Sequence, residues 1–565
     1  MAKKIGVYVC ECGNNIADNM DIDRIIEAVS PTRDVEVVEK YRLLCSEDGK
    51  EFLKQSIQEH ELTHLVIAAC SPKQHELTFM NVCVAAGLNP YLFQMVNIRE
   101  QCAWVTPDKG EATEKAIRQI KAAIGRVHFH DPLEKKEMDV SPDVLVIGGG
   151  IAGIKACQLL AAPNRMVYLV EKTSSLGGKV KGFEKLFTDM ESGSALIEKE
   201  INSLSGNENI EVLADSEVEQ ILGFFGNFET KIIKKLENEE RNLSVGAVVL
   251  ATGFDLLNPK GLSQYGYGEF DDVYTSLEFE EMNTSGGPTG GKVLVKNNKP
   301  PQSVAIMHCV GRKEKGYCSK VCCVYSLKFA RMLKSQLPEV KVFHLYSDLC
   351  IPGKSYQKFY EETKGLGVEF VRADRTEVTQ NGKGMTVKYE TKTAPKGELA
   401  VDMVILVPAM EPCSDTNKLA EMLGIPTDNE GFLAREHQIL SPVGASVAGA
   451  FVVGCAQGPQ NISESIVQSE AAAGKILSSL VPGRKLELEV KTSQISESFC
   501  SGCKLCISVC PYSAITFDEA RRISVVNEAL CHGCGVCAAA CPSGAASLNG
   551  FTFTQIYHEV AELVK

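Results

Sequence analysis

The stretch "DVLVIGGGIAGIKACQLLA", which runs from Asp143 to Ala161, decides the fold of the middle of the chain. An apolar run before the glycines predicts a buried strand, and the apolar-rich run after them predicts a helix. Gly148, Gly150 and Gly153 stand between the two at the spacing G-x-G-x-x-G. Such glycines permit a tight turn, and the helix N-terminus that follows offers free N–H groups to a pyrophosphate. The stretch therefore predicts a dinucleotide-binding βαβ unit.

Three later segments strengthen this prediction. The second strand, "MVYLVEK", ends in Glu171, which is placed to accept a hydrogen bond from a ribose hydroxyl, and "SLGGK" follows it. "VGAVVLATGF" predicts another buried strand. "GAFVVGCAQGPQNISESIVQSEAAAGK" predicts a strand that leads into a helix of small residues.

This arrangement resembles FAD-dependent reductases of the thioredoxin reductase class, in which the last helix directs its N-terminus at the flavin ring. The resemblance implies FAD as the cofactor; the alternative is a nucleotide fold with an empty site. The residues predicted to bind FAD are Gly148, Gly150, Ile151, Ala152, Gly153, Glu171, Lys172, Gly177, Gly178, Lys179, Ala251, Thr252, Gly253, Gly454, Cys455, Asn461 and Ile462.

A second nucleotide-binding half is expected to begin near Ser303, where the apolar strand "SVAIM" is present. No glycine motif follows this strand. The sequence continues as "HCVGRKEKGYCSKVCC" and has Cys309, Cys318, Cys322 and Cys323 in its place. Thiolates are stabilised at the start of a helix. We interpret the four as ligands of a [4Fe–4S] cluster beside the flavin, with a catalytic dithiol as the alternative. Either way, the nicotinamide site is lost.

The C-terminal part contains two runs of the form C-x₂-C-x₂-C-x₃-C-P, which is the bacterial ferredoxin pattern. In this pattern the fourth cysteine of each run binds the cluster of the other run. One predicted [4Fe–4S] cluster is bound by Cys500, Cys503, Cys506 and Cys541. The other is bound by Cys531, Cys534, Cys537 and Cys510. Zinc is the alternative, but zinc sites do not use two interlocked runs of this kind.

The first part of the chain also contains grouped cysteines. A C-x-C-G turn follows the predicted strand "KIGVYV", and a further cysteine ends the predicted strand "THLVIAA". We predict a fourth cluster, with Cys102 as a substitute ligand; the alternative is simple packing of small thiols in a core. The predicted ligands are Cys10, Cys12, Cys45 and Cys70. The cysteines interpreted as core or incidental thiols are Cys83, Cys157, Cys350, Cys413 and Cys455.

The composition fits a chain of several globular domains. It has 565 residues, of which 44% are hydrophobic, and a net charge of −13, which offers no basic face to a nucleic acid. No apolar run approaches the roughly 20 residues of a membrane helix, and the start does not read as a signal peptide. The 22 cysteines stand at ligand spacings, so we expect a cytoplasmic metalloprotein and not a secreted disulfide scaffold.

Linkers and motifs predict an α/β multidomain chain. Helices are predicted at "DIDRIIEAVS", "GKEFLKQSIQEH" and about Glu111–Val127. The expected organisation is an N-terminal α/β domain with a possible [4Fe–4S] site at 1–140, a first FAD-binding part at 141–300, a degenerate nucleotide-binding part with cysteines at 301–410, a second FAD-binding part at 411–490, and a bacterial ferredoxin domain with two [4Fe–4S] clusters at 491–565. The FAD domain is thioredoxin-reductase-like, with Rossmann-type βαβ units.

Beyond these motifs, the chain is similar to HdrA, the iron–sulfur flavoprotein component of heterodisulfide reductases. The similarity rests on "VYVCECG", "LCSEDGKE", "AACSPKQHE", "NPYLFQMVNIREQCAWV", "GGGIAG", "HCVGRKEKGYCSKVCCVYSLKFA" and the ferredoxin tail, which occur in order over nearly the whole chain. The resemblance implies a component of an anaerobic complex, in which the flavin divides electron pairs between a low-potential and a higher-potential acceptor. It also implies a catalytic role for Lys328, whose charge would stabilise an anionic reduced flavin; the alternative is a solvated helix lysine.

The resemblance further implies partners. These are ferredoxin, a second copy of the chain, and other components of the complex: HdrB-like and HdrC-like proteins, a hydrogenase with its small iron–sulfur protein of MvhD type, or a formate dehydrogenase. Longer members carry an inserted ferredoxin module, but the matching stretch here, "FTDMESGSALIEKE", has no cysteine. Three alternatives therefore remain: a conduit without bifurcation, a stand-alone NAD(P)H or dithiol reductase, and a scaffold with structural clusters.

Overall fold

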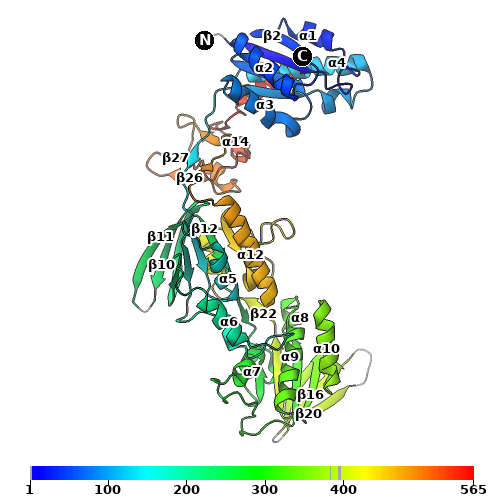
Figure 1. Ribbon diagram of the computed structural model, residues 1–565, viewed down its shortest axis with the longest axis vertical. Helices are drawn as coiled ribbons and strands as arrows, with labels where there is room; N and C mark the ends of the chain where they lie inside the picture. Colours follow the sequence, from blue (N-terminus) through cyan, green and yellow to red (C-terminus); the bar gives the residue numbers. More distant parts are fainter. Residues whose placement is uncertain (1–2, 236, 382–383, 392–395) are drawn as a thin grey trace. The chain divides into compact units, whose positions relative to one another are not determined.

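The chain divides into two units, each described here by itself. The computed structural model describes residues 3–235, 237–381, 384–391 and 396–565 (Figure 1). Unit 1 consists of Met1–Met138 and Glu487–Lys565, and unit 2 is Asp139–Leu486. The N-terminal domain and the ferredoxin tail, which the sequence presents as separate domains at opposite ends of the chain, therefore belong to one unit.

The N-terminal part of unit 1 is a four-stranded parallel sheet with the strand order β2-β1-β3-β4. Its strands are β1 (Ile5–Cys10), β2 (Val35–Tyr41), β3 (His64–Ala69) and β4 (Phe93–Asn97). Its helices are α1 (Ile22–Val29), α2 (Glu47–Glu59), α3 (Pro72–Ala86) and α4 (Lys109–Val127). Strands β1 and β3 are fully buried. The sequence pattern does not predict β2, which lies half-exposed at the edge of the sheet, where its apolar signal is weak.

The tail of unit 1 has the short hairpins and helices expected of a ferredoxin domain. Strand β25 (Ser493–Ile495) pairs with β28 (Ala546–Leu548), and β26 (Ile515–Asp518) pairs with β27 (Ile523–Val526). Two short helices, α13 (Leu505–Ser508) and α14 (Val536–Ala540), each contain the third cysteine of a run.

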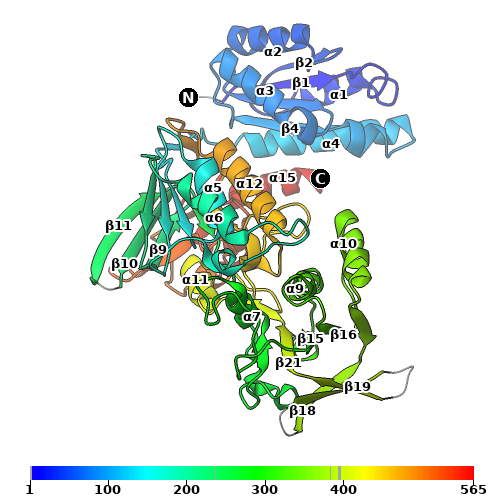
Figure 2. The same ribbon diagram turned by 60° about the horizontal axis from the view of Figure 1, so that its bottom comes forward.

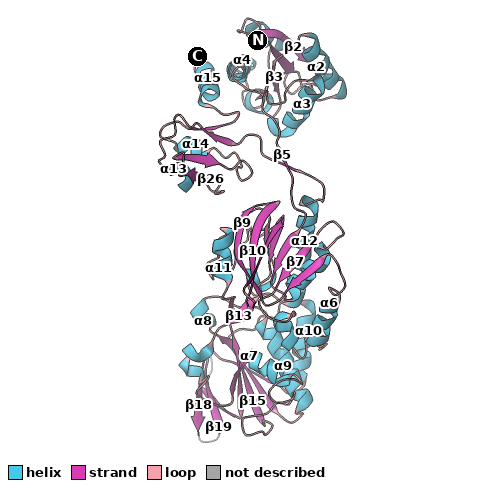
Figure 3. Ribbon diagram, turned by 90° about the vertical axis from the view of Figure 1, so that its left-hand side faces the viewer, coloured by secondary structure: helices cyan, strands magenta, loops and turns pink. Residues whose placement is uncertain are grey.

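The last helix, α15 (Phe553–Leu563), lies beside α4 (Figure 3). Arg126 and Glu559 form an ion pair at 2.8 Å between them. The buried side chain of Gln555 donates to the backbone oxygen of Phe129 at 2.9 Å, and the rings of Phe129 and His558 stack at 4.2 Å. These contacts attach the tail to the N-terminal domain.

Unit 2 contains two five-stranded sheets whose core strands are parallel, each covered on both faces. The first has the order β23-β12-β6-β7-β8, with β6 (Val144–Ile147), β7 (Val167–Val170), β8 (Ile210–Leu213), β12 (Ala247–Leu250) and β23 (Ala450–Val452). Val144 and Val146 pack under the helices α5 (Ile151–Leu160) and α12 (Ile462–Ser479). The alternate residues, Leu145 and Ile147, pack against the antiparallel strands β9 (Ser216–Phe224), β10 (Asn227–Lys234) and β11 (Glu239–Val245).

The second sheet repeats this layered design. Its order is β14-β21-β15-β16-β17, with β14 (Val273–Thr275), β15 (Ser303–Val310), β16 (Lys341–Tyr346), β17 (Glu369–Arg372) and β21 (Met403–Pro408). Helices α7 (Ser276–Asn283) and α9 (Cys322–Gln336) cover one face, and α10 (Lys354–Gly365) lies beside α9 (Figure 2). The antiparallel strands β18 (Arg375–Asn381), β19 (Gly384–Glu390) and β20 (Gly397–Val401) cover the other face.

The remaining short elements connect these layers. They are β5 (Glu137–Met138), β13 (Phe254–Leu256), β22 (Met410–Pro412), β24 (Leu486–Glu487), α6 (Gly193–Asn202), α8 (Arg312–Lys315) and α11 (Thr416–Leu423). No helix among the described residues is long and apolar enough to cross a membrane.

A buried histidine makes unit 1 sensitive to acid. The Nδ1–H group of His130 donates to the backbone oxygen of Tyr91 at 3.0 Å, and its buried Nε2 has no hydrogen-bond partner among the described residues. Burial, together with the charge of Arg126, lowers the pKa of His130 to about 4. Because the unfolded chain then binds the proton more readily, stability is lost as the pH falls from about 6.5 to about 4, by at most roughly 3 kcal/mol.

We expect His130→Asn to flatten this dependence, while His60→Asn, a half-buried site in the same unit, leaves it unchanged. Urea unfolding between pH 4.5 and 7.5, followed by the fluorescence of Trp104, the only tryptophan, measures it. An unchanged slope in His130→Asn contradicts this assignment.

Candidate functional site

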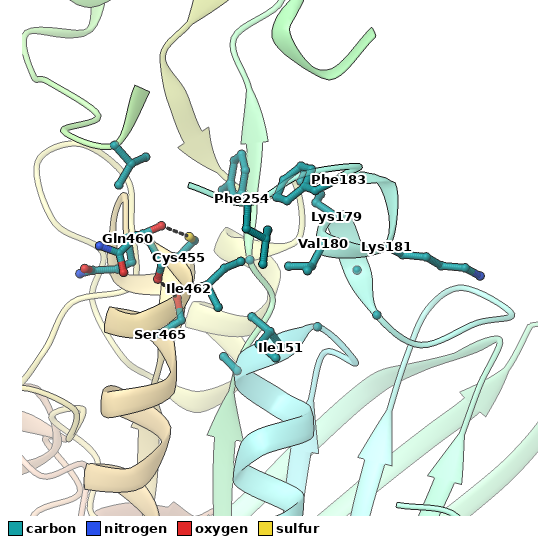
Figure 4. A pocket seen from close by; sticks show the side chains of 18 of the residues that line it. Ile151, Lys179, Val180, Lys181, Phe183, Phe254, Cys455, Gln460, Ile462 and Ser465 are labelled. Carbon is teal, nitrogen blue, oxygen red and sulfur yellow. Dashed lines mark hydrogen bonds between the residues drawn. The ribbon is translucent and has the colours of Figure 1, made fainter. Parts of the chain in front are cut away.

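Unit 2 contains a cavity of about 830 Å³ that is lined by residues from both of its halves. Fifteen of the seventeen predicted FAD-binding residues line it, and only Gly153 and Gly454 do not. Ile151, Val180, Phe254 and Ile462 converge on it, whereas the side chain of Lys181 extends away from the others (Figure 4). Residues from α9, among them Tyr325 and Lys328, form part of the wall, and sequence motifs alone did not place them there.

The glycine turn has the close packing that a bound pyrophosphate requires. Gly148 has φ +110°, and a Cβ atom there would lie 2.4 Å from the backbone oxygen of Ala251. At Gly153 a Cβ atom would lie 1.9 Å from the oxygen of Gly148, so glycine lets α5 pack against the turn. Gly150 is the N-cap of α5, and no atom of the described residues lies within 4 Å of a Cβ atom built there. The free N-terminus of α5 is therefore open to the cavity.

Two polar groups on the carboxyl edge of the sheet fit a nucleotide. Glu171 follows β7 and is buried, and its carboxylate accepts from the backbone N–H of Gly149 at 2.7 Å and from Thr173 at 2.8 Å. These bonds fix the carboxylate at the cavity wall. Thr252 also lines the cavity, and its Oγ1 is buried without a hydrogen-bond partner among the described residues. The residues present therefore fit FAD.

The N-terminus of α12 forms the opposite wall. Asn461 caps the helix, because its side chain accepts from the N–H of Glu464 at 2.8 Å while Glu464 accepts from the N–H of Asn461 at 3.0 Å. The Cys455 thiol contacts the oxygen of Gln460 at 3.4 Å, and burial raises its pKa to about 11. Cys455 lines the cavity as an uncharged thiol, and its neighbour Gly454 lies behind the wall with φ +64°.

Lys328 forms a buried ion pair at the cavity wall. Its Nζ contacts Glu280 and donates to the backbone oxygen of Lys185 at 2.8 Å, and it lies 5.3 Å from the ring centroid of Phe183. Both charged side chains are almost fully buried. Burial lowers the pKa of Lys328 and raises that of Glu280, and their mutual attraction opposes both shifts. The solvated-lysine alternative therefore does not describe this residue.

The four cysteines of the second half lie together at the carboxyl edge of its sheet. Cys309 ends β15 with φ +60°, Cys318 is exposed, and Cys322 and Cys323 begin α9. The Cys322 thiol bonds to Cys323, which raises the pKa of Cys322, and the charges of Cys318 and Cys309 raise it further. The bond from Cys322 lowers the pKa of Cys323, with a further contribution from His308. None of these thiols lines the cavity, but Val321, immediately before α9, does.

One further cysteine, which the sequence pattern presents as incidental, lies near this group. The backbone N–H of Cys350 donates to the Cys323 sulfur at 3.4 Å, and burial and the nearby Cys318 and Cys323 raise the pKa of Cys350. Cys350 follows β16, the strand adjacent to β15. Only this strand pairing brings it close, so no local spacing could have indicated it.

The eight ferredoxin cysteines surround two small cavities. One is lined by Cys500, Cys503, Cys506 and Cys541, and the other by Cys510, Cys531, Cys534 and Cys537. Each cavity thus receives three cysteines from one run and the fourth from the other run. Backbone N–H groups already point at several sulfurs, such as that of Ala514 to Cys510 at 3.3 Å.

The N-terminal cysteines divide into two groups. Cys10, Cys12, Cys45 and Cys70 influence one another electrostatically around the ends of β1 and β3. Arg99 donates to the Cys12 sulfur at 3.3 Å. Cys102 lies in another part of the core and contacts Gln119 at 3.4 Å. The structure therefore groups the four predicted ligands and separates Cys102 from them. Within the described residues, no three Cys, His, Asp or Glu side chains converge on a position for a single metal ion.

Comparison with known proteins assigns the family. A family model described as pyridine nucleotide-disulphide oxidoreductase matches residues 142–469, and a 4Fe-4S dicluster domain matches residues 499–545. An HdrA protein from Methanopyrus kandleri, named as the first of two iron-sulfur subunits of this type in its CoB--CoM heterodisulfide reductase, is 34% identical and covers 91% of this chain and 90% of its own length. The chain belongs to the HdrA family of heterodisulfide reductases.

Two further matches complete the comparison. An HdrA-like protein from Archaeoglobus profundus is 33% identical and covers 100% of this chain and 98% of its own length. Among solved structures, T. acidophilum thioredoxin reductase matches with a TM-score of 0.41 and 15% identity, over 60% of this chain and 98% of its own. For this member of the HdrA family, the predictions of an oxidoreductase, of FAD and of [4Fe–4S] clusters are confirmed, and so is the predicted fold class.

The ion pair beside the cavity predicts a large cost for breaking it from one side. Lys328→Met leaves the Glu280 carboxylate buried without its counter-charge, and we expect a loss of about 3–5 kcal/mol in unfolding free energy. The double variant Lys328→Met/Glu280→Gln removes both charges and should recover most of that loss. Urea unfolding at saturating FAD, followed by flavin release, measures the coupling. If the two single losses simply add in the double variant, the pair is not the reason for either.

Proposed function

We propose that this chain is the FAD- and iron–sulfur-containing electron-transfer component of an anaerobic oxidoreductase complex, and that electron pairs are divided at its flavin site. One electron of each pair goes to ferredoxin and the other to a second, higher-potential acceptor; confurcation is the reverse. Relatives support the choice of partners: one from Methanothermobacter thermautotrophicus, 32% identical, is named as the HdrA component of an H(2):CoB-CoM heterodisulfide,ferredoxin reductase.

The cysteines at the end of β15 are the observation that carries this proposal. The two halves of unit 2 share one layered design, yet the first has a glycine turn after its central strand and the second has Cys309 there. A cysteine side chain occupies the space that a phosphate needs close to the backbone. Cys318, Cys322 and Cys323 gather around the same strand end. Electrons therefore reach the flavin through a cluster on these four residues and not from a bound nicotinamide.

Lys328 gives the cavity a fixed cation within a wall that is otherwise largely apolar. FAD, when bound, supplies both two-electron and one-electron chemistry. The ammonium group of Lys328, positioned by Glu280 and by the oxygen of Lys185, favours negative charge on a ring placed next to it. Because burial lowers the pKa of Lys328, the group is also able to release a proton more easily than a surface lysine.

The remaining clusters extend the route in this proposal. The two ferredoxin clusters, bound by the eight cysteines of the tail, exchange electrons with ferredoxin or with another protein of the complex. A further cluster on Cys10, Cys12, Cys45 and Cys70 lies in the same unit as these two. The other partners proposed are HdrB-like and HdrC-like proteins, a hydrogenase or formate dehydrogenase, and a second copy of this chain.

A conduit that does not divide electron pairs is the second candidate, and one observation favours it. The alignment with the Archaeoglobus relative runs over 691 positions, whereas this chain contributes 565 residues. The relative therefore contains segments that this chain lacks. A lost electron route would leave a single path through the flavin.

The stoichiometry of the assembled complex distinguishes the two candidates. We expect reduction of ferredoxin and of the second acceptor in a 1:1 ratio of electrons, with neither reduced when the other is omitted. A conduit would reduce one acceptor regardless of the other. As a separate arm, anaerobic NADH added to the purified protein should leave the flavin absorbance unchanged, and direct bleaching would support a stand-alone reductase instead.

Iron content tests the cluster beside the flavin. Cys318→Ala should lose about four irons per FAD, the content of one cubane. Because Cys318 is exposed, this substitution should leave the fold intact. Cys350→Ala is the matched control and should retain all iron. Full iron content and an unchanged electron paramagnetic resonance spectrum in Cys318→Ala would remove the proposed ligand set.

A further inference from the structure

Two serines occupy equivalent positions in the repeated halves of the ferredoxin domain. Ser493 stands seven residues before Cys500, and Ser524 stands seven residues before Cys531, each the first cysteine of its run. Ser493 begins β25 and Ser524 lies in β27. Both are almost fully buried, with exposed fractions of 3% and 2%. The ferredoxin motif itself assigns no function to either residue.

Each serine lines the cavity of the opposite run. Ser493, although it leads into Cys500, lies in the cavity of Cys510, Cys531, Cys534 and Cys537. Ser524, although it leads into Cys531, lies in the cavity of Cys500, Cys503, Cys506 and Cys541. Strands β25 and β27 lie against each other, which explains the exchange. The two hydroxyls therefore follow the same crossed arrangement as the fourth cysteines.

The contacts of Ser493 show what such a hydroxyl can do. Its Oγ lies 3.2 Å from the Cys537 sulfur, and its backbone N–H donates to the Cys531 sulfur at 3.3 Å. The same hydroxyl can donate to the backbone oxygen of Ser547 at 3.1 Å. A thiolate sulfur can only accept. When Cys537 is a thiolate, the contact at 3.2 Å therefore persists as a hydrogen bond only if Ser493 donates.

Ser524 has no competing acceptor within the part of the chain that the structure describes. Its Oγ is buried and has no hydrogen-bond partner there. A buried hydroxyl without a partner is costly, and such a group calls for an explanation. The cavity that Ser524 lines supplies one, because its walls contain the four cysteine sulfurs of a single predicted cluster.

We propose that Ser493 and Ser524 are hydrogen-bond donors to the sulfur atoms of the two ferredoxin clusters, one serine for each cluster. A donor to sulfur draws negative charge away from the cluster and stabilises its reduced, more negative state, so it raises the reduction potential. The proton of Ser524 is uncommitted, whereas that of Ser493 is shared with the Ser547 oxygen. Ser524 therefore has the larger effect, and the two serines set the difference in potential between the clusters.

The test is a redox titration of the full-length protein, purified anaerobically and followed by electron paramagnetic resonance. Ser524→Ala and Ser493→Ala should each lower the midpoint potential of one ferredoxin cluster and leave the other unchanged, and the double variant should lower both. Ser498→Ala, an exposed serine of the same domain, is the control and should give the unaltered titration. Unchanged midpoints in both alanine variants at full iron content would overturn the proposal.

A second pair of variants covers loss of the cluster on substitution. Ser524→Thr and Ser524→Val have nearly the same shape, both suit a strand, and they differ in the hydroxyl. The threonine variant should keep the midpoint and the valine variant should lower it, and equal midpoints in the two would overturn the proposal. The inference depends on the two ferredoxin clusters and their crossed ligand assignment but not on how the flavin divides electrons. Iron content and two ferredoxin-type signals in the unaltered protein check that assignment independently.

Discussion

Both five-stranded sheets of unit 2 are covered on both faces, and this burial leaves only their edges for chemistry. Every residue of β6 and of β12 is buried, so neither strand has a side chain free to meet a ligand. The polar and sulfur-containing residues lie where the strands end: Gly148 after β6, Glu171 after β7, and Cys309 at the end of β15. Because parallel strands end at the same edge, residues far apart in the sequence meet there.

Backbone conformation shows how the second edge differs from the first. Gly148 has φ +110° in the first half, and Cys309 has φ +60° in the second. A left-handed conformation costs a residue with a side chain about 1 kcal/mol or more. Cys12, another predicted ligand, has φ +47°. Glycine would remove this strain at both positions, so the cysteines remain there for their sulfur and not for their backbone.

Local spacing predicted most of the site but none of the contacts that depend on strand pairing. The glycine turn and the ferredoxin runs are short motifs whose spacing encodes their geometry, and the residues of both motifs surround cavities. Glu280 and Cys350 could not be predicted from spacing. Glu280 is separated from Lys328 by 48 residues and meets it only because α7 and α9 cover the same sheet. Cys350 meets Cys323 only because β16 pairs with β15.

The buried pair of Lys328 and Glu280 has a consequence for how charge is held at the cavity. A lone cation in such a wall would lose its proton, because burial favours the neutral amine. Glu280 keeps the cation in place, yet one of its oxygens, Oε2, has no hydrogen-bond partner among the described residues. The carboxylate is therefore incompletely satisfied, and its hold on Lys328 is weaker than in a fully bonded pair. A negative charge that develops on a ring in the cavity can compete with Glu280 for the ammonium group. An incompletely bonded partner thus makes the cation available where a fully bonded one would sequester it.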